Sequence, residues 1–464
     1  MPAQLPSDFL RSLRKLDHFD PDAFVAAHAS GIHPVSVHMN PGKSIYCDGL
    51  WRETVSEPPF EISAAVPWAP DAYYLSARPS FTFDPFFHAG NYYVQEASGM
   101  FLAHALRQIT DGLEALKVLD LCAAPGGKST LIQSLISPDS LLVSNEVIKT
   151  RVPVLYQNIT KWGQANGMVS NNDPAHFKKL PGFFDLLVVD APCSGSGLFR
   201  KDPEAAANWN PDLVRLCSQR QQRILADAWD CLKEDGYLIY CTCSYSKEEN
   251  EDILDDVFKQ HSCISLSLSP DPRWKIVETQ SDQAQAWGYR FYPDRISGEG
   301  FFLALLQKKQ PTDRLAAVKS KDHSMRIHKT VERQAREWVD QESFHFLYVG
   351  DAVHALPQPL IEDFHVLKKA LYLKKAGIRM GKSAGNEWIP DHELSLANIL
   401  KVDTASLEVE KEDAIRYLSG EPFGAGFPAK GWKILTFKNQ RLGWVKLLEK
   451  RMNNYYPKSW RIRL

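Results

Sequence analysis

Two cysteines in the sequence occupy settings that favour nucleophilic chemistry. Cys193 follows Asp-Ala-Pro in residues 190–197, and Cys243 follows Cys-Thr in residues 240–245. Each cysteine comes at or just past the end of a predicted strand, so both should reach the same edge of one sheet. A thiolate can attack an electrophilic carbon and form a covalent intermediate, which divides one difficult step into easier ones. The alternative is that both are small buried hydrophobic residues, as most free cysteines are.

A glycine turn between a predicted strand and a predicted helix provides the second part of the site. In open α/β sheets, ligands bind beyond the carboxyl ends of the strands, and glycines let the backbone approach a ligand closely. The turn lacks the residue spacing of a phosphate loop or of a dinucleotide fold. It predicts a nucleotide-like ligand held by Cys122, Ala123, Ala124, Pro125, Gly126, Gly127 and Lys128.

Acidic residues follow the other predicted strands at matching positions. Glu146 ends the next strand, where a carboxylate would bind the hydroxyl pair of a ribose. Asp173 lies in a loop after the third strand and could reach an adenine amino group, and Asp190 ends the fourth strand. Such acids also serve as caps and turn formers. Suitable groups at four strand ends in register nevertheless favour a ligand site.

Strand-like and helix-like segments alternate through the middle of the chain. This alternation predicts an α/β fold with a doubly wound, mostly parallel sheet of the Rossmann-like type. The predicted strands are residues 117–121, 141–146, 184–190, 237–243 and 301–306, and the predicted helices are 129–135, 151–162, 211–232 and 248–260.

The overall composition indicates a soluble globular protein, with 44% hydrophobic and 24% charged residues and a net charge of −2. No apolar run reaches the roughly 18 residues of a membrane span, and the first residues lack the features of a signal peptide. We therefore expect a cytoplasmic protein without a membrane partner. Its 8 cysteines should be free thiols there, and without a paired Cys motif or His cluster no metal site is expected.

The last 35 residues carry a local excess of positive charge. Only Glu449 opposes the basic residues there, which are Lys430, Lys433, Lys438, Arg441, Lys446, Lys450, Arg451, Lys458, Arg461 and Arg463. Such a field can bind nucleic-acid phosphates although the whole chain is almost neutral. The alternative is an ordinary solvated face.

One reaction requires this combination of groups. Carbon 5 of cytosine is a poor nucleophile until a thiolate adds to carbon 6, after which the ring can attack a methyl group on a sulfonium. The reaction needs a thiolate-forming cysteine in a positive environment. It also benefits from an acid that bonds to the ring nitrogen and amino group, and Asp190 is placed for that role.

The motifs taken together resemble the Sun-type RNA (cytosine-5) methyltransferases, and most closely their RsmF-like bacterial ribosomal RNA branch. The combination is highly specific, and its members occur in family order and spacing over the whole middle domain. The matching stretches are residues 95–100, 122–128, 190–197, 200–203, 219–221, 241–251 and 299–302.

The resemblance implies a role for each site residue. Cys243 would be the nucleophile, and Cys193 would assist release of the methylated RNA. The turn from Cys122 to Lys128, with Glu146, Asp173 and Asp190, would bind S-adenosylmethionine, and Lys128 could also reach toward the target base.

The sequence departs from the family pattern at two positions. Cys241 stands where the family has a small residue, and Gly99 stands where it often has Ser or Thr. Neither change removes a catalytic group. Because Cys241 alternates with Cys243 along a strand, we expect Cys241 to point away from the pocket.

The resemblance and the charge pattern together suggest how the chain is divided. We expect a small α+β region for RNA positioning (1–110, with a helix over 92–106), a methyltransferase domain (111–308), a linker (309–330), an accessory α+β domain (331–400) and a basic PUA-like RNA-binding domain (401–464). The expected RNA contacts are Lys201, Lys458, Arg461 and Arg463, and Trp444 is expected in the core.

The expected substrate is a structured RNA, with small-subunit ribosomal RNA favoured and the protein a monomer. The target cytosine must leave its stack to be attacked, so a flipped base is expected. Three alternatives remain open: a transfer-RNA cytosine methyltransferase, a ribosome-assembly factor without catalysis, and a DNA-type enzyme that attacks with the thiol of Cys193 instead.

Overall fold

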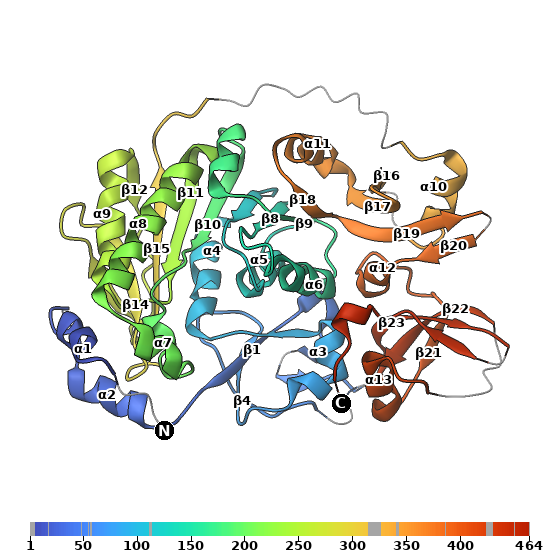
Figure 1. The fold of residues 1–464 in the computed structure, drawn as a ribbon, viewed down its shortest axis with the longest axis horizontal. Helices are drawn as coiled ribbons and strands as arrows, with labels where there is room; N and C mark the ends of the chain where they lie inside the picture. The colour runs from blue at the N-terminus through green and yellow to red at the C-terminus, as the bar shows by residue number, and fades with distance from the viewer. Residues whose placement is uncertain are drawn as a thin grey trace.

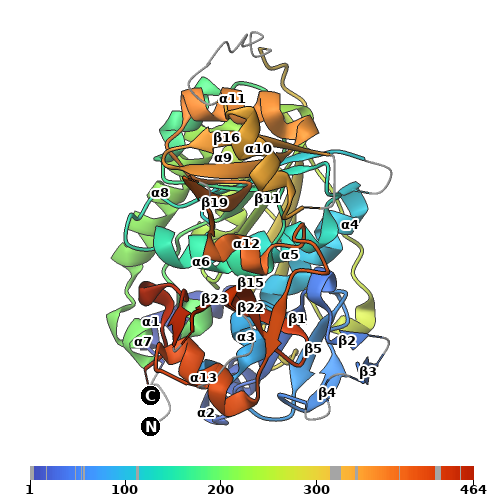
Figure 2. The ribbon, with the colours of Figure 1, turned by 90° about the vertical axis from the view of Figure 1, so that its right-hand side faces the viewer.

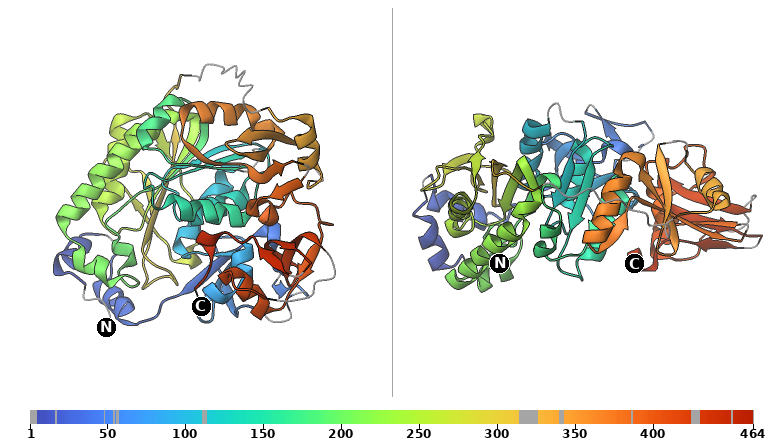
Figure 3. Two further views of the ribbon diagram at one scale, coloured as in Figure 1. Left: turned by 45° about the vertical axis from the view of Figure 1, so that its right-hand side comes forward. Right: turned by 90° about the horizontal axis from the view of Figure 1, so that it is seen from above.

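The computed structural model describes residues 5–16, 18–47, 49–53, 55, 58–110, 114–313, 326–339, 343–385, 387–423, 430–449 and 451–463. A large sheet with helices on both faces occupies one side of the molecule, and smaller sheets from the C-terminal half occupy the other (Figure 1). Helix α1 (Ser7–Leu13) and the last strands lie at opposite ends of the long axis (Figure 3).

Five parallel strands form the centre of the large sheet. Their order is β11-β10-β7-β8-β9. The strands are buried on both faces, as expected for parallel strands covered by helices. This arrangement confirms the predicted Rossmann-like sheet. The bounds are β7 Lys117–Asp120, β8 Leu141–Asn145, β9 Gly167–Ser170, β10 Phe184–Asp190 and β11 Leu232–Thr242.

Antiparallel strands extend this sheet at both edges. On the β11 side these are β15 (Phe301–Lys308), β14 (Trp287–Phe291), β13 (Val277–Gln280) and β12 (Cys263–Ser265). On the other side, β18 (Leu373–Ala376) pairs with β9. A strand from the region expected to form the accessory domain thus belongs to the methyltransferase sheet.

Helices cover the two faces of the sheet with separate hydrophobic cores. On one face, α8 (Pro211–Ala228), α9 (Glu251–Gln260) and α11 (Ile361–Ala370) pack on Leu119 and Val143. On the other, α4 and α5 pack on Val118 and Leu142, beside α6. Their bounds are α4 Leu102–Thr110, α5 Gly127–Leu135 and α6 Val152–Trp162.

Local sequence signals explain where the longest helix, α8, begins. The side chain of Asn210 accepts a hydrogen bond from the backbone N–H of Leu213, and Pro211 occupies the first helical position. Both features are favoured at helix starts, because a proline there loses no hydrogen bond and the cap satisfies a free N–H group. The capped helix places Gln221 beneath the cysteine loops.

The N-terminal region has a four-stranded sheet of order β4-β5-β1-β6 beside short helices. The helix expected over residues 92–106 is wrong in its first half. Residues Tyr92–Val94 form β6, because they pair with β1, and a 3-10 turn at Ser98–Phe101 precedes α4. Other elements are α2 Pro21–Ala29, β1 Val35–Met39, β2 Tyr46–Cys47, β3 Leu50–Trp51, β4 Ile62–Ala65, β5 Ala72–Leu75 and α3 Pro85–Ala89.

The C-terminal half forms two further four-stranded sheets, ordered β16-β17-β19-β20 and β21-β22-β23-β24. The first comprises β16 Phe344–Val349, β17 Ala352–Pro357, β19 Ile378–Ala384 and β20 Glu387–Pro390, with α10 Lys329–Arg336 and α12 His392–Leu396 nearby. The second comprises β21 Ser406–Glu408, β22 Gly431–Phe437, β23 Gln440–Leu447 and β24 Met452–Asn454, with α13 Lys411–Ser419.

The first and last parts of the chain share one hydrophobic core. The rings of Phe86 and Phe437 lie 5.2 Å apart, and the Asn91 side chain donates a 2.7 Å hydrogen bond to Gln440. Helix α12 lies against α6 (Figure 2), where Tyr156 donates a hydrogen bond to Glu393. The terminal regions expected as separate domains are therefore packed together around the methyltransferase domain.

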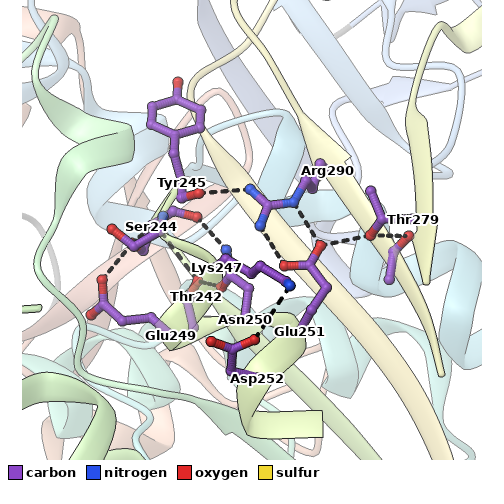
Figure 4. A network of polar contacts seen from close by, with 12 residues as sticks. Thr242, Ser244, Tyr245, Lys247, Glu249, Asn250, Glu251, Asp252, Thr279 and Arg290 are labelled. Carbon is purple, nitrogen blue, oxygen red and sulfur yellow. Dashed lines mark hydrogen bonds and ion pairs between the residues drawn. The ribbon is translucent and has the colours of Figure 1, made fainter. Parts of the chain in front are cut away.

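A buried ion pair fixes the chain just beyond Cys243. The Arg290 guanidinium pairs with the Glu251 carboxylate and also donates a 2.7 Å hydrogen bond to the Tyr245 carbonyl (Figure 4). Thr279 donates a further hydrogen bond to Glu251. Burial alone would raise the pKa of Glu251, but Arg290 and these hydrogen bonds lower it overall. The carboxylate is therefore ionised at neutral pH.

Removing one partner of this pair should leave a buried charge without compensation. We expect Glu251→Gln to lower stability by about 3–5 kcal/mol, measured as the shift in the urea unfolding midpoint. The exposed pair between Glu332 and Arg336 is the control, and Glu332→Gln there should cost no more than about 0.5 kcal/mol. Equal losses in the two variants would contradict the role given to the buried pair.

Candidate active site

A cavity of about 380 Å³ lies at the carboxyl ends of the central strands. Three parts of the chain line it: the N-terminal region, the strand ends with their loops, and the start of β15. The lining residues are Tyr93, Val94, Gln95, Glu96, Gly99, Cys122, Ala123, Ala124, Pro125, Gly127, Lys128, Asp190, Leu198, Cys243, Glu299, Gly300 and Phe301.

A larger cavity, of about 670 Å³, lies elsewhere, at α1, α8 and α9. Six carboxylates line it, from Asp8, Glu248, Asp252, Asp255, Asp256 and Asp282, and no thiol does. Two cations, Arg215 and Lys259, also line it, but the acids outnumber them, so the lining disfavours phosphate groups. The smaller cavity is therefore the one suited to chemistry.

The structure brings the two predicted cysteines together. The Sγ atoms of Cys193 and Cys243 lie 2.8 Å apart, and Cys243 lines the cavity. The hydrogen bond to Cys243 and burial both raise the pKa of the Cys193 thiol. Cys193 therefore keeps its proton and can donate it toward the sulfur of Cys243.

A lysine and an aspartate form an ion pair at the wall of the cavity. Lys128 Nζ lies 2.7 Å from Asp190 Oδ2 and 5.1 Å from the centre of the Phe301 ring. Burial by itself lowers the pKa of Lys128, but the nearby negative charges, that of Asp190 first among them, and the hydrogen bond to Asp190 together raise it overall. Lys128 is therefore a cation, and the pair places a donor and an acceptor side by side in the cavity.

The glycine turn forms the part of the wall next to α5. Gly126 has a φ of +114°, which side chains other than glycine rarely adopt. At Gly127, a Cβ atom would lie 3.1 Å from the Tyr93 ring, so the close approach of the N-terminal region favours glycine. The turn leaves backbone groups and the positive end of the α5 dipole facing the cavity.

The acids predicted at the next two strand ends lie on the same edge but do not line the cavity. Glu146 is buried, accepts a hydrogen bond from the N–H of Ile148 and pairs with Arg151 at 3.3 Å. Asp173 begins a 3-10 helix and accepts from the N–H of Ala175. The structure thus gathers most of the predicted cofactor residues around the cavity, but not Gly126, Glu146 or Asp173.

Asp120, at the end of β7, is a buried acid to which the sequence analysis gave no role. Ser129 donates a 2.6 Å hydrogen bond to its Oδ2, whereas Oδ1 has no partner among the residues that the structure describes. Burial raises its pKa from 3.8 to about 7, with the nearby charge of Asp190 adding to the effect. The sequence feature that could have identified Asp120 is its position directly before the glycine turn.

The N-terminal wall of the cavity was also missed. Tyr93, Gln95 and Glu96 line the cavity, although the sequence analysis placed them in a helix. Glu96 accepts hydrogen bonds from the backbone N–H groups of Gly99 and Glu299, which ties this wall to the start of β15. The motif at residues 95–100 indicated that this segment belongs to the site. It did not indicate that the preceding residues pair with β1 as a strand.

Cys241 is buried and does not line the cavity, but alternation with Cys243 along the strand is the wrong explanation for this. Residues two apart on a strand face the same side, so alternation would have pointed Cys241 with Cys243. The strand β11 ends at Thr242, and the chain then turns. The Cys241 sulfur lies 3.8 Å from Asp190 Oδ1, below the cavity.

The residues predicted to contact RNA differ in how far their side chains are exposed and in whether they pair with an acid. Lys458 and Arg463 are exposed. Arg461 is half-buried and packs against Gly420, and Lys201 Nζ lies 3.5 Å from the buried carboxylate of Glu299. Acids from outside the basic segment also neutralise part of it, as Glu387 does for Lys446, while Trp444 is fully buried as expected.

The site fits S-adenosylmethionine on features of the structure itself. The cavity volume lies within the range of about 300–1,000 Å³ typical of small-molecule sites. Its wall includes Gly127 of the glycine turn, and one oxygen of the buried Asp120, at the end of β7, has no hydrogen-bond partner among the residues that the structure describes. Fold and site together define an S-adenosylmethionine-dependent methyltransferase.

Comparison with known proteins identifies the family. Residues 110–307 match the model of the 16S rRNA methyltransferase RsmB/F, residues 5–97 match the N-terminal domain of 16S rRNA methyltransferase RsmF, and residues 404–462 match the methyltransferase RsmF PUA domain. The chain belongs to the RsmF-type ribosomal RNA methyltransferase family.

Individual relatives agree with this assignment over most of the chain. The chain is 30% identical to ribosomal RNA small subunit methyltransferase F of Psychromonas ingrahamii, over 86% of this chain and 85% of that protein. It is 27% identical to the protein of the same name from Aliivibrio fischeri, over 98% and 97%. The structure resembles a methyltransferase homolog protein from Pyrococcus horikoshii, with 26% identity and a TM-score of 0.51, over 66% of this chain and all of that one.

Within the part of the chain that the structure describes, no helix has the length and apolar character needed to cross a membrane. The same residues contain no cluster of three or more potential metal ligands.

The raised pKa of Asp120 predicts a specific dependence of stability on pH. Its stabilising contribution is fully present below about pH 4 and is lost as the pH rises through about 7, because the folded state resists ionisation. The stability of Asp120→Asn relative to the wild type should therefore increase as the pH rises from 4 to 7, by at most about 4 kcal/mol in total. Above pH 7 this difference should stay constant. Urea unfolding at a series of pH values measures this gain.

The exposed Asp212 offers a matched control, since its side chain is 85% accessible. Asp212→Asn should leave the pH dependence of the unfolding midpoint unchanged. A gain for Asp120→Asn that is the same at pH 4 and pH 8 would show that folding does not raise the pKa of Asp120.

Proposed function

We propose that this protein methylates carbon 5 of a cytosine in small-subunit ribosomal RNA through a covalent adduct with Cys243. The observation that carries the proposal is the pair of thiols 2.8 Å apart, of which Cys243 lines a cavity that Lys128, Asp190 and the glycine turn also line. Two thiols, an ion pair and a cofactor turn at one sheet edge are what this reaction needs.

The cofactor site is formed by the turn from Cys122 to Lys128, with Glu146 and Asp173 at the neighbouring strand ends. Bound S-adenosylmethionine supplies an electrophilic methyl group on a positively charged sulfur. The buried carboxylates at this edge favour a cationic ligand, because opposite charges attract more strongly where water is excluded.

Cys243 attacks carbon 6 of the cytosine. It faces the cavity, and the S–H group of Cys193 stabilises the thiolate form by a hydrogen bond. Covalent addition at carbon 6 makes carbon 5 nucleophilic, which is the step that the bare ring cannot achieve.

Asp190 and Lys128 hold the ring while charge develops on it. Asp190 can accept a hydrogen bond from the cytosine amino group, and Lys128 keeps the carboxylate in place at 2.7 Å. A charge pair fixed before the reaction stabilises the developing charge without reorganising.

Cys193 serves the release step. After methyl transfer, carbon 5 loses its proton to a base and the bond between carbon 6 and Cys243 breaks. The thiol of Cys193, whose pKa is raised, is the donor nearest to the departing sulfur. Its hydrogen bond favours the free thiolate of Cys243 over the adduct.

The N-terminal and PUA-type regions support RNA as the partner. The target base must be flipped out of its stack to enter the cavity, which the N-terminal strand β6 helps to enclose. We infer that the protein acts as a monomer in the cytoplasm, where its ribosomal substrate is found. Transfer RNA is the second candidate, because the active site itself meets only one base.

Methylation assays separate the substrates and test the catalytic role. Purified protein is incubated with labelled S-adenosylmethionine and either small-subunit ribosomal RNA or transfer RNA, and bisulfite sequencing then locates 5-methylcytosine. Methylation of ribosomal RNA alone is expected. Methylation of transfer RNA alone would show that transfer RNA is the substrate in place of ribosomal RNA. RNA binding without methylation would support a non-catalytic assembly factor.

The two cysteines should give opposite results when replaced. Cys243→Ala should lose methyl transfer by at least about 1,000-fold, since the covalent route is closed. Cys193→Ala should accumulate a covalent adduct with RNA, seen as slow migration on a denaturing gel, because attack continues and release fails.

Cys263, at the strand β12, provides the control, and Cys263→Ala should change neither property. RNA containing 5-fluorocytosine traps the adduct, and mass spectrometry identifies the modified cysteine. Attachment at Cys193 instead of Cys243 would show that the roles are reversed, as in the DNA-type enzymes.

The exposed tail cations should contribute to RNA affinity through phosphate contacts. Replacing Lys458 and Arg463 together by Gln should reduce the slope of log affinity against log salt by about 1.4, or about 0.7 for each lost contact with single-stranded RNA. Filter binding across a salt series measures the slope. Lys430, which pairs with Glu449, is the control. An unchanged slope would exclude this surface as a contact.

A further inference from the structure

One buried carboxylate connects the two loops that carry the thiols. The Glu249 side chain is fully buried. Its Oε1 accepts a 2.7 Å hydrogen bond from the backbone N–H of Ser194, and its Oε2 accepts hydrogen bonds of 2.6 Å from Ser194 Oγ and 2.5 Å from Ser244 Oγ. Gln221 adds a longer contact of 3.4 Å to Oε1.

The two serines are the immediate neighbours of the two thiols. Ser194 follows Cys193 in the chain, and Ser244 follows Cys243. The bond from Glu249 to Ser244 is visible in Figure 4, at the start of the loop that continues to Tyr245. A single side chain thus bonds to the residue next to each sulfur, and its two oxygens span the gap between the loops.

Asn250, which follows Glu249 in the chain, fixes only one of these loops. Asn250 accepts a hydrogen bond from Thr242 and donates one to the Ser244 carbonyl, and both contacts lie within the loop of Cys243. Between the loops there are also the backbone bond from Gly197 N–H to the Cys243 carbonyl and the bond from Tyr245 N–H to Ser196 Oγ. On the Cys193 side these two bonds start from Gly197 and Ser196, whereas Glu249 bonds to Ser194, the residue directly after Cys193.

A buried carboxylate without a cationic partner lowers the stability of the fold. Its presence here is explained if its hydrogen bonds have another role. No lysine or arginine pairs with Glu249 among the residues that the structure describes, and burial raises its pKa although the serine hydrogen bonds act against this. An apolar side chain would fill the space without that cost. Three short hydrogen bonds to two loops therefore point to a geometric role.

We propose that Glu249 is a positioning residue that sets the distance between the Cys193 and Cys243 thiols. It does not line the cavity, so it acts on the reaction only through the loops. In catalysis this spacing would let Cys193 assist when the bond to Cys243 breaks, which rests on the proposed function. The spacing itself is a property of the folded protein and can be measured without RNA.

Disulfide exchange with glutathione reports the spacing directly. The Cys243 thiolate attacks oxidised glutathione and releases one glutathione thiol. Cys193 then gives up its proton and displaces the second glutathione, so two protein thiols are oxidised and one glutathione disulfide is reduced. The equilibrium ratio gives the effective concentration of one thiol at the other, and peptide mapping by mass spectrometry identifies the Cys193–Cys243 bond.

We expect Glu249→Ala to lower this effective concentration by about 10-fold or more, because the loops lose their common anchor. Glu249→Gln, whose amide can still bond to both serines, should recover most of it. The exposed neighbour Glu248 is the matched control, and Glu248→Ala should equal the wild type. An unchanged equilibrium in folded Glu249→Ala protein, even with reduced thermal stability, would overturn the proposal.

Should Glu249→Ala fail to fold, the double variant Ser194→Ala and Ser244→Ala tests the same contacts from the other side. It removes two of the three short bonds and keeps the carboxylate. A 10-fold or greater fall in effective concentration supports the role of Glu249, and wild-type behaviour refutes it.

A second measurement links the spacing to the reaction. With 5-fluorocytosine RNA and S-adenosylmethionine, Glu249→Ala should form the covalent adduct more slowly, and with ordinary RNA its kcat should fall while KM stays near the wild-type value. Equal losses in kcat and in cofactor binding would indicate general damage and count against positioning. If the wild type forms no adduct, the proposed function fails, whereas the glutathione equilibrium still decides the role of Glu249.

Discussion

The parallel pairing of β10 with β11 is the constraint on which the site depends. In this register Asp190 lies opposite Cys241, and the Ala191 N–H continues the ladder with a 2.8 Å bond to the Cys241 carbonyl. Two loops that are 50 residues apart in sequence therefore leave the sheet side by side. A slip of one residue would turn the side chains of one strand to the opposite face and separate the thiols.

Other parts of the molecule pack against the edge of the sheet where β10 and β11 end. The N-terminal region places Tyr93 and Gln95 against the glycine turn, so the cavity is complete only when this region is folded onto the sheet. The same region shares its core with the C-terminal strands. RNA-binding parts and the reaction centre are consequently held in a fixed relation, which suits an enzyme that must reach one base within a large folded RNA.

Sequence reasoning located the residues that the structure brings together where the signal lies in a few neighbouring residues. Cys193, Cys243 and Lys128 could be found because each follows a strand whose end the hydrophobic pattern marks, and a parallel sheet gathers such ends. It failed where position depends on distant pairing. Tyr93 became part of a strand through β1, Asp120 acquired its raised pKa from burial by several elements, and the edge strand at 373–376 joined a sheet formed 200 residues earlier.

That late edge strand has a consequence for how the chain is made. Until residues 373–376 emerge from the ribosome, β9 presents a row of unsatisfied backbone groups, the kind of open edge that recruits other chains. The nascent protein must keep this edge apart from its neighbours while the next 200 residues are synthesised. The translation time between β9 and β18 is thus an interval of vulnerability to aggregation, and shielding by a chaperone would matter most during that interval.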